Sequence, residues 1–272
     1  MGQNAVKVLK ITISNSPKNK ILEEIQKYLA REPRKSQKPL KIFTPNTEQL
    51  VFANKNPGFT SILNQADISI PDAIGVIWAS RFLTNNGPKT NIPGVEFMGN
   101  LVELAENRHV TIGLIGGRDN LAVDTLNCLR QNTKTLTGWA EDGPDIDVNK
   151  SDFTVRNEDE KIYFSRIIRH IIRENTQIIF VAFGPPKQEW FILRIAQELM
   201  SSDNRLPIVL MAVGGSFDII SGRLPRAPLW MRSIGLEWFW RLILEPRRII
   251  RQFALIEFMW LVLREKLFSR SS

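Results

Sequence analysis

Residues 177–213 read QIIFVAFGPPKQEWFILRIAQELMSSDNRLPIVLMAV. The stretch opens and closes on nearly continuous apolar runs, at 177–183 and 207–213. Such runs are typical of strands that are buried on both faces of a parallel sheet. Between them, residues 187–200 have the apolar spacing of an amphipathic helix, and prolines precede its first turn. This order predicts a parallel strand–helix–strand unit.

The same alternation extends toward the N-terminus. Further strands are predicted at residues 7–13, 40–43, 68–71 and 110–115, and further helices at 18–31, 47–55, 95–107, 120–131 and 159–174. We therefore expect an α/β fold with a Rossmann-like, mostly parallel sheet flanked by helices. Ligands of such sheets bind beyond the carboxyl ends of the strands, so the loops there are the candidate site. The polar residues 141–157 are predicted to be a surface loop.

The composition changes near Gly222. Residues 222–272 contain ten Arg or Lys but four Glu, and they hold four of the seven Trp. We predict an α/β core over residues 1–221 and a basic, Trp-rich helical appendage over 222–272. Residues 253–263 are apolar apart from Glu257, but a membrane-spanning helix needs about 20 apolar residues. This segment is expected to lie on a membrane, to pack on the core or to contact another subunit.

Bulk properties narrow the class of protein. A chain of 272 residues with 43% hydrophobic residues can bury a full core, and its single cysteine, Cys128, excludes an internal disulfide. Residues 1–20 lack the apolar region of a signal peptide, so we expect a cytoplasmic protein. Arg with Trp and Leu favours peripheral association with an anionic membrane, here the inner face of the plasma membrane. No groove-reading motif supports nucleic acid as the partner.

Polar residues follow the predicted strands at several points. Asp72 comes after strand 68–71, where a carboxylate could act as a general base or could cap a helix. Thr44 and Asn46 end strand 40–43 and could orient a sugar or phosphate, or close a turn. Glu96 and Asp67 are weaker carboxylate candidates.

Two glycine-containing loops could approach phosphate groups. Gly116, Gly117 and Arg118 follow strand 110–115, but they form neither a complete dinucleotide fingerprint nor a P-loop, and a tight turn is an equal alternative. The second loop, with Gly214, Gly215 and Asp218, follows strand 207–213.

Other chemical signals are weaker. Gln188 opens a predicted helix, and its amide could bind sugar hydroxyls or phosphate. Asp145 and Asp147 spell D-x-D, a metal-binding pattern of some glycosyltransferases, but no predicted strand precedes them. We expect no metal there.

The motifs gain specificity from their order along the chain. FGPPKQEW at 183–190 and VGGSFD at 213–218 precede RAP at 226–228, GLEW at 235–238 and EPRR at 245–248. TPN at 44–46 and PDAIG at 71–75 lie upstream. Over residues 42–251 this arrangement closely resembles the WecG/TagA/CpsF glycosyltransferases, which build bacterial surface polysaccharides.

The resemblance implies an inverting transferase that needs no metal cofactor. The implied donor is UDP-N-acetylmannosamine or its uronic acid, and the acceptor is the 4-hydroxyl of N-acetylglucosamine on undecaprenyl diphosphate. By resemblance, Asp72 is the general base, and Thr44, Asn46 and Gln188 belong to the catalytic pocket. Asp218 is implied at the uridine, and Arg241, Arg248 and Arg251 are implied near the diphosphate. We hypothesise that the appendage completes this site at the membrane.

One position departs from the family pattern. Asn91 stands where the family usually carries an arginine, and Lys89 is a possible substitute for that charge. A different hexose therefore stays open as the transferred sugar. A nucleotide-dependent oxidoreductase and a non-catalytic membrane adaptor remain as rivals from other classes, and a homo-oligomer formed through the appendage is compatible with its Trp and Leu content.

Overall fold

A six-stranded parallel sheet forms the centre of the molecule. The computed structural model describes residues 5–149, 152–156, 159–233, 236–245 and 249–269. The strands are β3 (Leu40–Phe43), β4 (Ile68–Ser69), β5 (Thr111–Gly116), β6 (Gly138–Glu141), β9 (Thr176–Ala182) and β10 (Val209–Ala212), in the order β4-β3-β10-β9-β5-β6. All neighbouring pairs are parallel, which confirms the predicted fold class.

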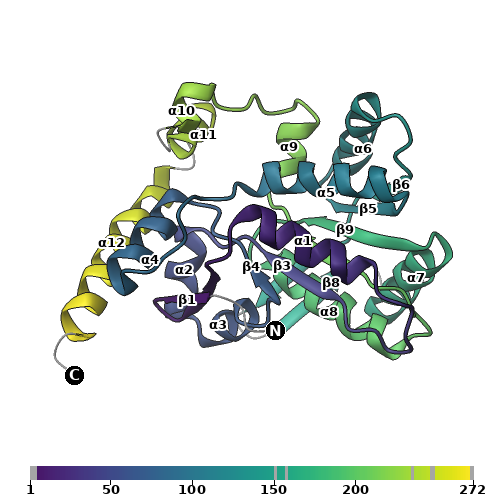
Figure 1. Ribbon diagram of the computed structural model, residues 1–272, viewed down its shortest axis with the longest axis horizontal. Helices are drawn as coiled ribbons and strands as arrows, with labels where there is room; N and C mark the ends of the chain where they lie inside the picture. The colour runs from purple at the N-terminus through teal and green to yellow at the C-terminus, as the bar shows by residue number, and fades with distance from the viewer. Residues whose placement is uncertain (1–4, 150–151, 157–158, 234–235, 246–248, 270–272) are drawn as a thin grey trace.

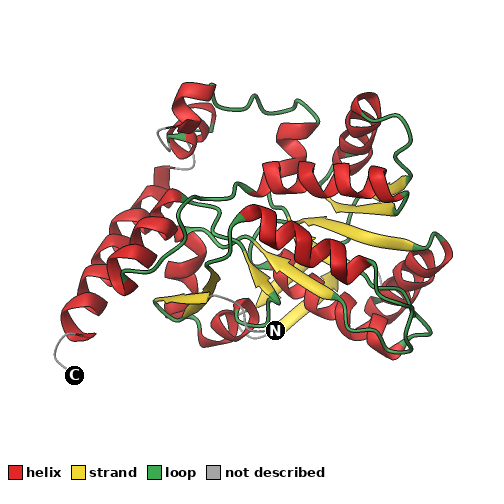
Figure 2. Ribbon diagram, in the orientation of Figure 1, coloured by secondary structure: helices red, strands yellow, loops and turns green. Residues whose placement is uncertain are grey.

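Helices cover both faces of this sheet (Figures 1 and 2). One apolar cluster joins the sheet to α2 (Thr47–Lys55), α3 (Pro57–Leu63), α7 (Glu160–Arg173) and α8 (Lys187–Ser201). The other cluster joins it to α1 (Lys18–Leu29), α5 (Gly94–Arg108), α6 (Leu121–Asn132) and α9 (Ser216–Ile220). Side chains alternate between the two along a strand, so Ile179 packs in the first cluster and Phe180 in the second.

The predicted core helices are confirmed to within two residues at each end. Their apolar stripes were long enough to show the helical period. Helix α4 (Ile74–Thr84) follows Asp72, as expected. Helix α3 and strand β6 were not predicted, because one is short and the other is only partly buried at the sheet edge.

The prediction of a parallel strand at residues 7–13 is wrong. These residues belong to an antiparallel hairpin of β1 (Ala5–Val8) and β2 (Ile11–Ser14), which is separate from the main sheet. Leu9 has φ 54, so the chain turns back at this point. The alternation of buried and exposed residues in β1 is that of a strand covered on one face.

The prediction of a surface loop at residues 141–157 is also wrong. Glu141 ends β6, and an antiparallel hairpin follows, formed by β7 (Asp145–Asn149) and β8 (Asp152–Arg156). Ile146 is buried, with 3% of its surface exposed. The polar composition concealed a period-2 pattern, because the acidic residues alternate with Ile146 and Val148.

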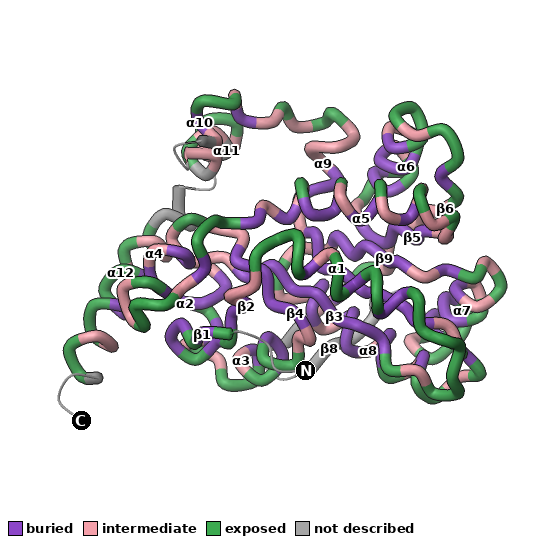
Figure 3. The backbone as a smooth tube through the Cα atoms, viewed as in Figure 1, coloured by how far each residue is buried: buried purple, intermediate pink, exposed green. Residues whose placement is uncertain are grey.

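From Leu229 onward the regular elements are helices: α10 (Leu229–Ser233), α11 (Glu237–Leu244) and α12 (Ile249–Ser269). Helix α12 lies against α2 and α4 (Figure 1), and its Phe258, Leu261 and Val262 are buried in the first apolar cluster. Figure 3 shows α10 and α11 much less buried than the sheet. None of the described helices is long and apolar enough to cross a bilayer.

Candidate active site

The carboxyl ends of the strands bring most of the predicted residues to one edge of the sheet. Asp72 follows β4, Thr44 follows β3, Gly214 follows β10, Gln188 comes after β9, and Gly117 follows β5. Neighbouring strands lie about 4.8 Å apart, so the edge from β4 to β5 extends over about 19 Å. An extended substrate could therefore contact several of these loops at once.

Asp72 and Thr44 face a common space. The Oδ1 atom of Asp72 accepts a hydrogen bond from the backbone N–H of Gly94 at 2.7 Å. A Cβ atom placed on Gly94 would lie 3.7 Å from both this oxygen and the hydroxyl oxygen of Thr44. The hydroxyl also donates to the backbone oxygen of Ala212 at 3.3 Å. A carboxylate and a hydroxyl thus meet beside the first turn of α5.

The two sequence interpretations of Asp72 are compatible in this geometry. Its carboxylate binds the N-terminus of α5, whereas the helix that follows it in sequence, α4, has Ala73 at its N-cap position and no side-chain cap. Asp72 is half-buried, and the hydrogen bond from Gly94 orients its carboxylate. A general base needs that orientation.

Asn46 and Gln49 form a reciprocal cap at the start of α2. The Asn46 side-chain oxygen accepts from the Gln49 backbone N–H at 3.0 Å, and the Gln49 side-chain oxygen accepts from the Asn46 backbone N–H at 3.1 Å. This capping box confirms the structural alternative for Asn46. It also holds the loop after β3 in place.

Gln188 lies in a buried hydrogen-bond network. Its side-chain oxygen accepts from the Gly214 backbone N–H at 2.9 Å, and its amide nitrogen donates to Glu189 Oε1 at 2.9 Å. The same Glu189 oxygen accepts from Gln49 Nε2 at 2.9 Å. Gln188 therefore ties the loop after β9 to the loop after β10. Sequence analysis assigned Glu189 no role at the site.

The glycine loop after β5 is a tight turn. Gly116 has φ 117, and a Cβ atom there would lie 2.7 Å from the Ala182 backbone oxygen. The Gly117 N–H donates to that oxygen at 3.0 Å, and the Asn120 N–H donates to Asp142 Oδ2 at 2.7 Å. These N–H groups already have protein partners, so the turn alternative describes this loop best.

A cavity of about 390 Å³ opens beside this turn. It lies between the ends of β5 and β9, whose following helices, α6 and α8, cover opposite faces of the sheet. Such a switch point is the usual ligand crevice of an open α/β sheet. The residues that line it include Gly117, Arg118, Asp145, Phe183 and Lys187. Sequence analysis did not identify Lys187 as a site residue. Its position at the start of a helix that follows a strand was a signal that it could face a ligand.

Comparisons with known proteins show which family the chain resembles. Residues 6–272 match the model of the glycosyl transferase WecG/TagA/CpsF family. The chain belongs to this family of glycosyltransferases. Membership confirms the resemblance and decides against the oxidoreductase and the non-catalytic adaptor.

Two relatives cover most of the chain, and both are named N-acetylglucosaminyldiphosphoundecaprenol N-acetyl-beta-D-mannosaminyltransferase. The one from Bacillus subtilis (strain 168) is 30% identical over 226 residues, which are 83% of this chain and 79% of the relative. The one from Staphylococcus aureus (strain NCTC 8325 / PS 47) is 27% identical over 262 residues, which are 96% of this chain and 93% of the relative.

The structure does not test the appendage arginines that the resemblance to the WecG/TagA/CpsF family implies. Arg248 and the side chains of Arg241 and Arg251 lie outside the described part of the chain. Two other arginines reach Glu96 in the first turn of α5, with Arg226 at 2.6 Å and Arg232 at 3.6 Å. Sequence reasoning missed this link between the appendage and the helix that binds Asp72.

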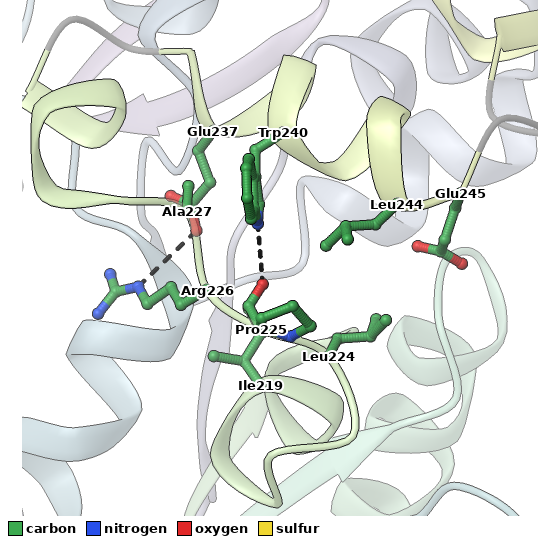
Figure 4. Close-up of a pocket in the computed structure, with 9 residues that line it drawn as sticks. All are labelled: Ile219, Leu224, Pro225, Arg226, Ala227, Glu237, Trp240, Leu244 and Glu245. Atoms are coloured by element: carbon green, nitrogen blue, oxygen red, sulfur yellow. Dashed lines mark hydrogen bonds and ion pairs between the residues drawn. The ribbon is translucent and has the colours of Figure 1, made fainter.

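The smaller cavity in Figure 4 lies between Ile219 of α9 and residues of the appendage. It measures about 10 Å³, enough for about one water molecule. Trp240 Nε1 donates to the Pro225 backbone oxygen at 3.0 Å, and Arg226 lies 3.8 Å from Glu237. These contacts fix α11 on the segment that connects it to the core.

The remaining candidates fall into three places. Asp218 and Gly215 lie at α9, on the same edge as Gly214. Asn91 is exposed, and its Nδ2 atom lies 3.5 Å from the Asp72 backbone oxygen, so the departure from the family pattern is next to the candidate base.

Asp67 precedes β4 at the opposite edge, where it binds Lys41 at 2.7 Å, so it is a structural residue.

The D-x-D pattern lies on β7. Asp145 pairs with Arg118 across 3.4 Å at the mouth of the larger cavity. Within the residues that the structure describes, no group of three or more His, Cys, Asp or Glu is placed to hold a metal ion.

Proposed function

We propose that this glycosyltransferase moves an N-acetylmannosamine-type sugar, N-acetylmannosamine or its uronic acid, from UDP to lipid-linked N-acetylglucosamine. The acceptor would be the 4-hydroxyl of N-acetylglucosamine on undecaprenyl diphosphate. The names of the two relatives support lipid-linked N-acetylglucosamine as the acceptor and N-acetylmannosamine as the sugar, whereas the 4-hydroxyl and the uronic acid rest on the family resemblance. The family resemblance supports UDP as the carrier and inversion at the anomeric carbon.

The single observation that carries the proposal is the Asp72 carboxylate beside the Thr44 hydroxyl. In the proposed reaction, Asp72 removes the proton from the acceptor hydroxyl while that oxygen attacks the anomeric carbon from the side opposite UDP. The hydrogen bond from Gly94 would hold the carboxylate in the required direction. Thr44, Asn46 and Gln188 would position the sugars, which removes much of the entropic barrier to the displacement.

The cavity between β5 and β9 is the proposed donor site. Its volume, about 390 Å³, suits a nucleotide-sized ligand, and Arg118 and Lys187 supply positive charge for a diphosphate. Asp218 is proposed at the uridine, with Gly116, Gly214 and Gly215 nearby. We propose that basic side chains, including Arg241, Arg248 and Arg251, stabilise the departing UDP without a metal ion.

A sugar-transfer assay in EDTA tests this proposal. Purified protein is mixed with the lipid-diphosphate acceptor and either UDP-N-acetylmannosamine or UDP-N-acetylmannosaminuronic acid. Transfer from one donor is expected and identifies the sugar. Transfer that appears only after Mg²⁺ or Mn²⁺ is restored would contradict metal independence. No transfer from either donor with vesicles and metal present would contradict the proposed reaction.

We also propose that the appendage docks on the anionic inner face of the plasma membrane. Its outer surface exposes several large apolar side chains, of which Trp230 is 63%, Phe253 69% and Trp260 56% exposed. Arg264 lies over the Trp260 ring at 4.8 Å, which pairs a cation with an interfacial aromatic. Such a surface fits a lipid headgroup region, where the acceptor is anchored. A homo-oligomer formed through the same helices is the alternative cover for these side chains.

A further inference from the structure

Glu189 is a fully buried carboxyl group next to the proposed catalytic pocket. It has 0% exposure and lies in the first turn of α8. Its Oε1 atom accepts from two amides, and its Oε2 atom is buried without a hydrogen-bond partner among the described residues. Burial raises the pKa of Glu189 to about 7, although the Gln188 amide, the backbone N–H of Glu189 itself and the Gln49 amide lower it.

Ordinary helix capping does not account for this burial. A glutamate at the third helical position usually accepts from the backbone N–H of the N-cap residue. Here the N-cap residue is Pro186, which has no N–H group. The carboxylate of a first-turn glutamate can also interact with the helix dipole while it remains in water, where it avoids the cost of desolvation. A different role must favour the buried position.

The carboxyl group determines which way two neighbouring amides point. An ionised carboxylate only accepts hydrogen bonds, so Gln188 and Gln49 must both turn their NH2 groups toward it. Their oxygens then face the backbone N–H groups of Gly214 and Asn46. If Glu189 is neutral, a proton on Oε2 leaves Oε1 as the same acceptor. One oxygen atom thereby sets the orientation of a network that joins the loops after β3, β9 and β10.

We propose that Glu189 is a positioning residue for sugar transfer, which acts through Gln188 and Gln49 to hold Gln188, Asn46 and Gly214 in the arrangement that the substrates need. This inference rests on the proposed function. A glutamine at position 189 has nearly the same shape, but its amide must either bury an NH2 group where Oε2 has no partner or present that NH2 to the two neighbouring amides. Burying an unpaired NH2 group costs stability, and presenting it to the two amides would force both to turn around, which would shift the loops after β3, β9 and β10 relative to one another.

The test compares Glu189→Gln with a matched change on the same helix, Glu198→Gln. Glu198 is partly exposed and pairs with Arg194 at 3.0 Å, remote from the network. In the transfer assay, we expect Glu189→Gln to lower kcat by about tenfold to a hundredfold, since small misplacements of reacting groups cost that much. KM for the UDP-sugar should change less than kcat, the melting transition should stay cooperative, and Glu198→Gln should behave as wild type.

A double-mutant cycle separates positioning from general damage. In a Gln188→Ala background, Glu189→Gln should cost clearly less than it does alone, because one of the two amides through which Glu189 acts is already gone. Unchanged kcat in Glu189→Gln, or a full additional loss in the double variant, would overturn the inference. If wild type itself transfers no sugar, the proposed function fails first, and this inference fails with it.

A second variant tests the inference even if Glu189→Gln does not fold. Gln49→Met keeps the side-chain length but removes the donor to Glu189 and the acceptor for the Asn46 N–H. We expect a lower kcat with a normal circular dichroism spectrum. Wild-type kcat in this variant would also overturn the inference, because the link to the loop after β3 would then be dispensable.

Discussion

A single substitution at Asp72 can distinguish an effect on substrate binding from an effect on the chemical step. Asp72→Asn keeps the side-chain oxygen that accepts from Gly94 but removes the charge. We expect kcat to fall by about a hundredfold to ten-thousandfold, the usual contribution of a general base, with donor binding retained. Transfer kinetics and calorimetric titration with UDP measure the two effects. Asp203→Asn, an exposed aspartate before β10, is the control. Near-wild-type turnover in Asp72→Asn would remove Asp72 as the base.

Glu189 should give the protein a distinctive pH dependence of stability. Its pKa is raised from 4.5 to about 7 in the folded state, so folding favours the protonated group. The stability that this preference supplies is present below pH 4.5 and is lost as the pH rises to about 7. The loss amounts to about 3 kcal/mol at most.

Urea titrations at pH 5 and pH 8 test this dependence. Relative to wild type, Glu189→Gln should gain unfolding free energy as the pH rises, because it has no proton to lose. Identical pH dependence in the two proteins would show that Glu189 does not titrate in this range.

At the scale of elements, the turn after β5 controls how closely two strands approach. Gly116→Ala would place a methyl group 2.7 Å from the Ala182 backbone oxygen at φ 117. We expect a loss of about 1–3 kcal/mol of unfolding free energy and weaker donor binding, because the turn borders the larger cavity. Gly99→Ala in helix α5 is the matched control, with nothing within 4 Å of its Cβ position.

The control substitution should change the unfolding free energy in the opposite direction. Alanine in a helix interior is favoured over glycine by about 0.5–1 kcal/mol, so Gly99→Ala is expected to raise stability. Chemical denaturation and UDP titration of both variants provide the measurement. Equal stability changes in the two would contradict the close approach of β5 and β9.

At the scale of the whole molecule, α12 has two faces with different expected roles. Phe258 is fully buried against the core, whereas Phe253 on the same helix is 69% exposed. Phe258→Ala should cost about 3–5 kcal/mol of stability through the cavity that it leaves. Phe253→Ala should leave stability unchanged but weaken binding to vesicles of phosphatidylglycerol by about tenfold, since it removes an inserted side chain.

Thermal melts and vesicle co-sedimentation read out the two effects separately. Vesicles of neutral phosphatidylcholine control for the contribution of charge. Full vesicle binding by Phe253→Ala combined with loss of self-association in sedimentation velocity would assign this face to a second copy of the chain instead.

Local patterns in the sequence were sufficient for the parallel sheet, the core helices and the motif order of the family, because each depends on residues close together in the chain. The runs at 177–183 and 207–213 needed no tertiary information to be identified as strands. Hairpins β1–β2 and β7–β8 were misassigned, because their pairing depends on a turn conformation and on which single face is covered.

Tertiary structure alone decided which side chains meet. Asp72 caps α5 rather than its own helix. Glu189 accepts from the amide of its neighbour Gln188 and from that of Gln49, which lies 140 residues away in sequence. Neither contact has a local signature, since each joins segments that come together only when the elements pack. The sequence therefore determined the elements and the class of enzyme, and the packing of those elements determined how the candidate site is built.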